Sequence, residues 1–192
     1  MSEEKIINIP NILSFYRLLA FPFVLYFAIS GQEKLFVILL MVNLATDILD
    51  GWIARAFHMQ TEFGARLDSV ADIGTYILAI AGIFAFKASE FQPHLVSFGI
   101  FIMLFAVAHL LSILKHKRLP SLHLYSWKIG GYIQGFFFFV LFVFDFYPVL
   151  YYIMICWGIL AFCEHICIQL IIKSMQSNQK GIYWVLKDRK IK

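Results

Sequence analysis

Six stretches of about 20 mainly apolar residues run along this 192-residue chain. A helix of about 20 such residues crosses the hydrocarbon core of a bilayer, and short polar breaks separate the stretches from one another. The predicted spans are 11–30, 35–57, 67–87, 94–114, 128–146 and 149–173. The sequence therefore predicts an all-α, polytopic membrane protein with six transmembrane helices.

The composition supports a membrane protein rather than a large soluble core. Hydrophobic residues make up 61% of the chain and charged residues only 15%, whereas soluble domains carry roughly 45–50% apolar and about 25% charged residues. The length suits one domain, so we expect residues 1–192 to form a single transmembrane domain. Within it, residues 1–10 are interpreted as a short interfacial helix, and residues 174–192 as a basic cytoplasmic tail.

The basic residues predict the orientation of the spans. With a cytoplasmic N-terminus and six alternating spans, fourteen of the sixteen lysines and arginines lie at the inner surface, and only Lys34 and Lys87 face outward. This bias is typical of cytoplasmic loops. We expect an integral protein of the bacterial cytoplasmic membrane with both termini inside. Anionic lipid head groups account for the net charge of +4 without nucleic acid as a partner.

Four acids and an arginine interrupt the second and third spans. Asp47 and Asp50 are three residues apart and share a helix face, which Arg55 extends, and Asp68 and Asp72 share a face of the next span. The loop between these spans is short, so the helices are antiparallel neighbours whose acidic faces meet. Charged groups in hydrocarbon are costly and mark functional sites. We expect them to line a polar cavity that faces the cytoplasm.

Carboxylates gathered in this way require a positive partner. Four of them cannot all stay ionised at close range without one, and oxygen ligands alone favour Mg²⁺ or Mn²⁺ over zinc or copper. Gly51 would let a ligand approach the helix backbone, and Arg55 can form paired hydrogen bonds with phosphate oxygens. Structural ion pairs and a transport path for protons or divalent cations are the alternatives, but a transport path does not explain Gly51, Ala54, Arg55 and Gly64.

The string Asp47-x2-Asp50-Gly51-x2-Ala54-Arg55-x8-Gly64-x3-Asp68-x3-Asp72 resembles, without a gap, the signature of the CDP-alcohol phosphotransferases. The resemblance implies a homodimeric membrane enzyme of phospholipid synthesis, in which an alcohol displaces CMP from CDP-diacylglycerol with the help of two divalent metals, Mg²⁺ or Mn²⁺. By the same resemblance, the four aspartates hold the metals, Asp72 is also the base, and Gly51 and Arg55 contact the nucleotide diphosphate. A divalent-cation or proton transporter and a catalytically silent binding protein remain alternatives.

The acceptor alcohol stays open between glycerol 3-phosphate, serine and an inositol phosphate. The opening Asn8-Ile-Pro-Asn-Ile-Leu-Ser-Phe-Tyr-Arg17 is similar to phosphatidylglycerophosphate synthases, whereas Leu67-Asp-Ser-Val-Ala-Asp72 is similar to phosphatidylserine synthases. Arg66, Arg118 and Lys128 are candidates to bind the acceptor, although topology alone also demands positive charge at the inner surface.

Three further features of the apolar spans are an arginine, an acid–histidine pair and a pair of tyrosines. Arg17 is either an interfacial residue that reaches toward the head groups or part of the cavity wall. Glu164 and His165 either line the acceptor pocket or brace a neighbouring helix. The pair Tyr151 and Tyr152 is predicted to face lipid near the interface.

Overall fold

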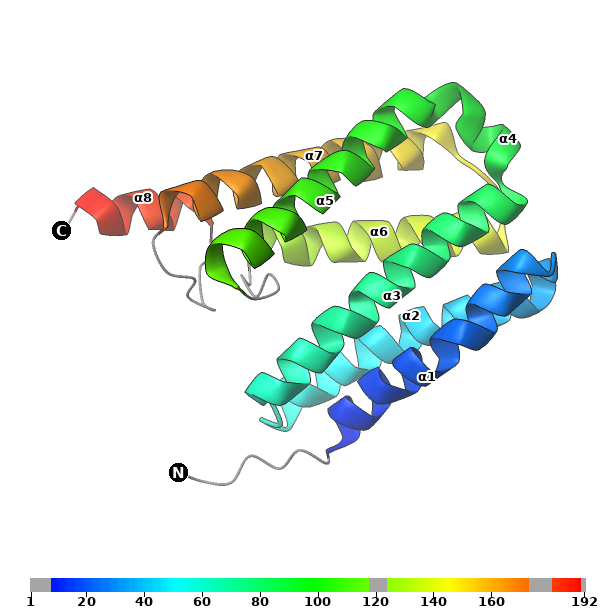
Figure 1. Ribbon diagram of the computed structural model, residues 1–192, viewed down its shortest axis with the longest axis horizontal. Coiled ribbons are helices and arrows are strands. Elements are labelled where there is room, and N and C mark those ends of the chain that lie inside the picture. The colour runs from blue at the N-terminus through cyan, green and yellow to red at the C-terminus, as the bar shows by residue number, and fades with distance from the viewer. Residues whose placement is uncertain (1–7, 118–123, 173–180, 191–192) are drawn as a thin grey trace. The chain divides into compact units, whose positions relative to one another are not determined.

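The computed structural model describes residues 8–117, 124–172 and 181–190, and these residues are almost entirely helical. The elements (Figure 1) are α1 (Ile9–Ile29), α2 (Glu33–Ala56), α3 (Glu62–Phe86), α4 (Ala88–Phe91), the 3-10 turn η1 (Gln92–His94), α5 (Leu95–His116), α6 (Tyr125–Val143), α7 (Pro148–Ile171) and α8 (Ile182–Lys190). Within the described ranges, six helical stretches are long and apolar enough to cross a membrane. The predicted all-α architecture with six spans is confirmed.

The third span begins earlier than its apolar residues suggest. Its helix starts at Glu62 rather than at residue 67, because the Thr61 hydroxyl oxygen accepts a hydrogen bond of 2.9 Å from the backbone N–H of Gly64. A threonine in this position satisfies an N–H group that the first helical turn leaves without a partner. The earlier start places Asp68 two turns inside α3, where the helix is regular.

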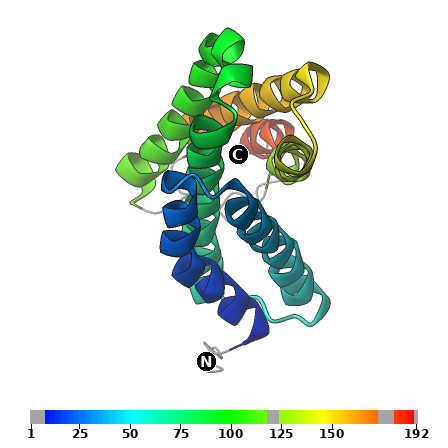
Figure 2. The same ribbon diagram turned by 90° about the vertical axis from the view of Figure 1, so that its right-hand side faces the viewer.

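The chain forms two compact units, Met1–Phe91 and Gln92–Lys192. In the first unit, α1 packs against both α2 and α3, and more extensively than these two pack against each other. Figure 2 shows α1 beside α3 in this arrangement. Residues 1–7, which make up most of the predicted interfacial helix, lie outside the described residues.

The interior of the first unit changes character along its length. At one end it is apolar, with Val24, Phe36, Leu40 and Ile83 completely buried. At the other end, the first half of α1 buries polar side chains, including Asn11, Ser14 and Arg17. Burying polar groups is costly unless they find partners, so this end of the unit is where partners must be sought.

Local sequence signals join α1 to the α2–α3 connection. The Asn8 side chain caps α1 by accepting a hydrogen bond of 2.9 Å from the backbone N–H of Asn11. Its Nδ2 atom also donates to the Met59 carbonyl oxygen at 3.4 Å. The start of α1 is thereby tied to the segment that precedes α3.

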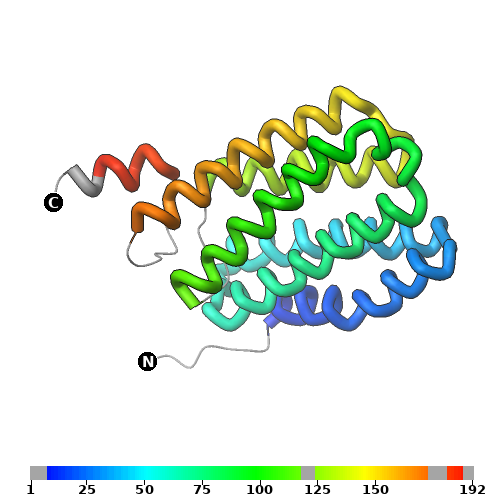
Figure 3. Tube along the Cα trace, turned by 45° about the horizontal axis from the view of Figure 1, so that its top comes forward, coloured from blue at the N-terminus to red at the C-terminus, as the bar shows by residue number. Residues whose placement is uncertain are grey.

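In the second unit, α7 packs against α5, α6 and α8, and Figure 3 shows α7 running alongside α5. The helices α5 and α7 approach closely at Gly158, where an added Cβ atom would collide with the Phe101 ring. The predicted cytoplasmic tail 174–192 includes α8, whose residues Ile182 and Val185 pack on Leu124 and Ile168. The tail is therefore partly folded against the helices that precede it.

The expectation that Tyr151 faces lipid is wrong. Its side chain is completely buried, and its hydroxyl lies 2.8 Å from the Ser97 hydroxyl oxygen and donates to the His94 carbonyl oxygen at 3.2 Å. Tyr152 keeps an exposed ring, and its hydroxyl contacts Nδ1 of His94 at 3.0 Å. The turn η1 and the first turn of α5 therefore supply the polar partners that allow Tyr151 to point inward.

Candidate functional site

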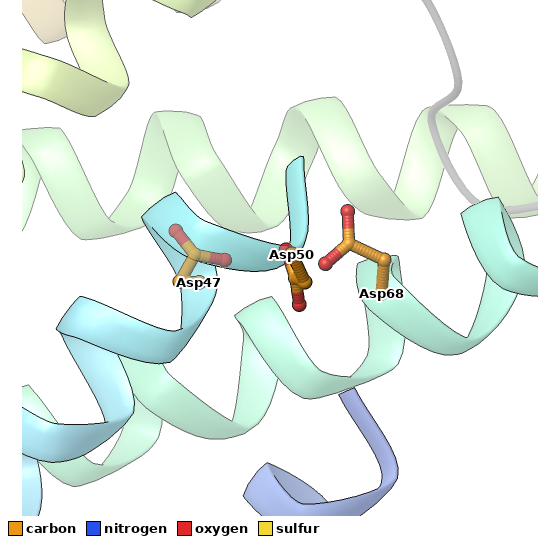
Figure 4. Close-up of side chains that lie close together, drawn as sticks. All are labelled: Asp47, Asp50 and Asp68. Atoms are coloured by element: carbon orange, nitrogen blue, oxygen red, sulfur yellow. The ribbon is translucent and has the colours of Figure 1, made fainter. Parts of the chain in front are cut away.

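The acidic faces of α2 and α3 meet as the spacing of their aspartates predicts. Asp47 and Asp50 lie in the second half of α2, and Asp68 and Asp72 in the first half of α3. In Figure 4 the carboxylates of Asp47, Asp50 and Asp68 point toward one another. One oxygen from each of these three lies within 4.8 Å of the others. This separation allows one small cation to contact all three carboxylates.

Arg17 from α1 reaches into the middle of the four carboxylates. Its Nη1 atom contacts Oδ1 of Asp47 at 2.5 Å and Oδ1 of Asp72 at 2.9 Å. Its Nη2 atom contacts Oδ2 of Asp50 at 2.8 Å and Oδ1 of Asp68 at 2.5 Å. Each terminal nitrogen therefore joins one carboxylate of α2 to one carboxylate of α3, and a single guanidinium ties three helices together.

The four carboxylates differ in their exposure. The Asp50 side chain is only 4% exposed, whereas those of Asp47, Asp68 and Asp72 are 41–43% exposed. Oδ2 of Asp50 also accepts a hydrogen bond of 3.1 Å from the Ser14 hydroxyl. Asp50 is thus buried against α1, while the other three carboxylates are more open to solvent.

The charges of the site suit a divalent cation. When ionised, the four carboxylates carry four negative charges, and the Arg17 guanidinium that contacts all of them neutralises one. The donors are carboxylate oxygens on two neighbouring helices, which is the ligand type that Mg²⁺ and Mn²⁺ prefer. The residues present therefore fit the metal that the sequence resemblance implies.

Gly51 and Arg55 lie next to each other on the same face of α2. A Cβ atom on Gly51 would lie 3.1 Å from Nη1 of Arg55, so the arginine side chain folds back over the glycine. The missing side chain of Gly51 gives the guanidinium room against the helix. Arg55 itself is exposed, and it offers its N–H groups at the edge of the acidic cluster.

Gly64 marks a close approach of α1 and α3. A Cβ atom there would collide with the Asn11 side-chain oxygen and would lie 2.9 Å from the Thr61 hydroxyl oxygen. Only glycine fits this contact without a shift of the neighbouring groups. Gly64 thus helps to hold α1 close enough to α3 for Arg17 to reach the aspartates.

Two of the three candidates for acceptor binding lie within the described residues. Arg66 is exposed on α3 and pairs with Glu62 at 3.4 Å. Lys128 is exposed on α6, where its Nζ atom lies 5.8 Å from the centre of the Tyr125 ring. Arg118 lies outside the described residues.

Glu164 and His165 engage neighbouring helices in the second unit. The Glu164 carboxylate accepts hydrogen bonds from the Ser126 hydroxyl and, at 2.9 Å, from the Ile182 backbone N–H. His165 is completely buried and lies 2.7 Å from Nε2 of Gln169. Of the two interpretations, these contacts favour the bracing of neighbouring helices, since Glu164 joins α6 and the start of α8 to α7.

Two contributors to the site are not predicted by the acidic motif. Ser14 lies outside the motif, and the sequence around Arg17 is compatible with both an interfacial and a site position. The signal lay in their spacing, because Asn11, Ser14 and Arg17 recur every three residues and form a polar stripe on one side of an otherwise apolar helix. Asn43, one turn before Asp47, is also buried, and its sequence context gave no indication of this.

Three relatives share similarity with the chain over short segments. A CDP-diacylglycerol–glycerol-3-phosphate 3-phosphatidyltransferase of Cereibacter sphaeroides is 38% identical over 77 residues, which are 38% of this chain and 35% of the relative. Proteins of the same name from Aquifex aeolicus and Escherichia coli K12 are each 37% identical, over 34% of this chain and 36% and 37% of their own lengths. The matched segment therefore spans about a third of these relatives.

No solved structure matches the chain. The family model described as CDP-alcohol phosphatidyltransferase matches residues 7–164, which include all four aspartates, Gly51, Arg55 and Gly64. This match covers most of the chain and every position of the signature. The chain therefore belongs to the CDP-alcohol phosphatidyltransferase family.

Proposed function

We propose that this membrane protein transfers a phosphatidyl group from CDP-diacylglycerol to the hydroxyl of a small polar alcohol and releases CMP. The observation that carries the proposal is the convergence of Asp47, Asp50, Asp68 and Asp72 on one point between α2 and α3. The complete family signature supplies these residues. Three of the carboxylates are also 41–43% exposed, which leaves them accessible to a ligand.

The metal ions are part of the same proposal. Asp47, Asp50, Asp68 and Asp72 would hold two Mg²⁺ or Mn²⁺ ions. When bound, such ions neutralise a diphosphate and make its phosphorus more open to attack. The structural support is the donor set itself, which is purely carboxylate, close-packed and short of positive charge.

Asp72, Arg55 and Gly51 have separate roles in the proposed reaction. Asp72 is half-exposed and takes the proton from the incoming hydroxyl as the new phosphate ester bond forms. Arg55 binds diphosphate oxygens of the donor, because a guanidinium offers paired N–H groups to phosphate. Gly51 leaves the space that this arginine and the donor need.

Glycerol 3-phosphate is the acceptor that we propose first. The relatives from Cereibacter, Aquifex and Escherichia are named for transfer to glycerol 3-phosphate. A phosphorylated acceptor needs cations, and Arg66, Arg118 and Lys128 are the candidates to supply them. Serine and an inositol phosphate are the acceptors against which this choice is tested.

The setting of the site follows from the same reasoning. The basic residues favour a bacterial cytoplasmic membrane with both termini and the site on the cytoplasmic side. CMP and a polar alcohol exchange with the cytosol, whereas the acyl chains of the donor stay in lipid. Family resemblance adds a homodimer, which cross-linking of the protein in native membranes would test.

The function is tested with purified protein, CDP-diacylglycerol and Mn²⁺ or Mg²⁺. Glycerol 3-phosphate, serine and inositol 1-phosphate are supplied in separate reactions, and the lipid products are identified by mass. We expect CMP release in step with phosphatidylglycerophosphate formation, and no release when EDTA replaces the metal. If a lipid product formed only with serine or only with the inositol phosphate, that alcohol would replace glycerol 3-phosphate as the proposed acceptor. If no acceptor led to CMP release, the proposed transferase function would be wrong.

A further inference from the structure

Arg17 has an unusual position for a positive charge in a metal-binding family. Its side chain is 1% exposed, and its two terminal nitrogens contact one oxygen of each of the four aspartates at 2.5–2.9 Å. Its Nε atom is buried without a hydrogen-bond partner among the described residues. The four aspartates of α2 and α3 thus hold the Arg17 side chain in place.

The two terminal nitrogens of Arg17 divide the four carboxylates into two pairs. Nη1 lies between Asp47 and Asp72, and Nη2 lies between Asp50 and Asp68. Each nitrogen takes one oxygen from α2 and one from α3. The guanidinium therefore uses the carboxylates that the proposed function assigns to the metals, and it uses them in two pairs across the helix interface.

A guanidinium and divalent cations oppose each other at this range. Like charges a few ångströms apart repel strongly where water is scarce, and a carboxylate oxygen directed at an N–H group is less available to a metal. Without any cation, however, carboxylates this close together would repel one another and drive α2 and α3 apart. A positive charge on α1 prevents this.

We infer that Arg17 is a built-in counter-cation, which holds the aspartate cluster together in the metal-free protein and competes with the divalent metals for its oxygens. This inference rests on the proposed metal-dependent function and adds a positioning residue on a third helix. Metal binding and the contacts of Arg17 are then coupled, so that each weakens the other.

The test compares the parent protein with Arg17→Gln by titrating the detergent-solubilised protein with Mn²⁺ and measuring free Mn²⁺ by electron paramagnetic resonance. We expect Arg17→Gln to bind Mn²⁺ more tightly by about ten-fold or more, since a repelling unit charge is removed at close range. In EDTA this variant should melt at a lower temperature than the parent. Saturating Mn²⁺ should raise its melting temperature by more than it raises that of the parent.

Two further variants separate the possible outcomes. Arg17→Lys keeps the charge but cannot span four carboxylates, so we expect a folded protein with intermediate Mn²⁺ affinity. Lys34→Gln also removes one positive charge, but at the start of α2, away from the end that carries Asp47 and Asp50. This control should leave the Mn²⁺ affinity unchanged.

The parent could bind Mn²⁺ while Arg17→Gln and Arg17→Lys bind it equally well or more weakly. This result would overturn the inference about Arg17 but not the metal site. Should Arg17→Gln fail to fold in EDTA, the Arg17→Lys titration decides by the same criterion. Absence of Mn²⁺ binding by the parent would overturn the metal site itself. The CMP assay is independent of both measurements, so failure of this inference is distinguishable from failure of the proposed function.

Discussion

Gly64 of α3 lies directly against the side-chain oxygen of Asn11 on α1, so closely that a Cβ atom has no room between them. This contact lies two helical turns from Arg17 along α1 and one turn from Asp68 along α3. The distance between the two helices at this point therefore controls whether the guanidinium reaches its four carboxylates. Gly64 therefore acts as a packing residue that helps to set the geometry of the site.

Replacement of Gly64 by alanine should lower stability and activity together. The new methyl group must push Asn11 aside and crowd the Thr61 hydroxyl, and overpacking of this kind costs about 1–3 kcal/mol. Thermal melting in detergent and CMP release measure the two effects. Gly99→Ala is the matched control, because an added Cβ meets nothing within 4 Å there. Equal melting temperatures for Gly64→Ala and Gly99→Ala would contradict the tight contact.

The number of spans and the meeting of the aspartates could be predicted from the sequence for simple reasons. Span length follows from bilayer thickness, and residues three or four apart share a helix face in any regular helix. Asp47 and Asp50 therefore had to lie together, and a short loop had to bring them near Asp68.

The rest depends on how whole helices rotate against one another, which no local pattern fixes. The direction in which α1 turns Arg17 is set by its packing on two helices at once. Tyr151 illustrates the same limit, since its inward position depends on Ser97 and the His94 carbonyl oxygen, which are more than fifty residues away. Periodicity finds polar faces, but their partners are known only from the fold.

Asp72→Asn should abolish turnover and leave the fold intact. The amide cannot take a proton from the incoming alcohol, and loss of a general base typically lowers the rate by 10²–10⁴-fold. Its oxygen can still accept the hydrogen bond from Arg17, so the melting temperature in EDTA should stay close to that of the parent. Asp145→Asn, in the exposed connection between α6 and α7, serves as the control. Normal CMP release by Asp72→Asn would remove Asp72 from the reaction.

Gly51→Ala is expected to impair donor binding more than folding. Its methyl group would lie 3.1 Å from the end of the Arg55 side chain, which is flexible and exposed and can move at little cost. The displaced guanidinium would lose its charge-assisted hydrogen bonds to the diphosphate, so the KM for CDP-diacylglycerol should rise by about ten-fold. Steady-state kinetics alongside Gly99→Ala provide the measurement. A large fall in melting temperature with an unchanged KM would show that Gly51 is needed for packing instead.

Glu164→Ala should release α8 and leave acceptor binding unchanged. The substitution removes the carboxylate that receives both the Ile182 backbone N–H and the Ser126 hydroxyl, so the start of α8 loses its hydrogen-bonded tie to α7. Limited trypsin digestion followed by mass analysis should show faster cleavage around α8 than in the parent. Ser126→Ala loses only the α6 contact and should keep α8 protected, which separates the two bonds. A raised KM for the acceptor, with α8 still resistant to trypsin, would instead place Glu164 in the acceptor pocket.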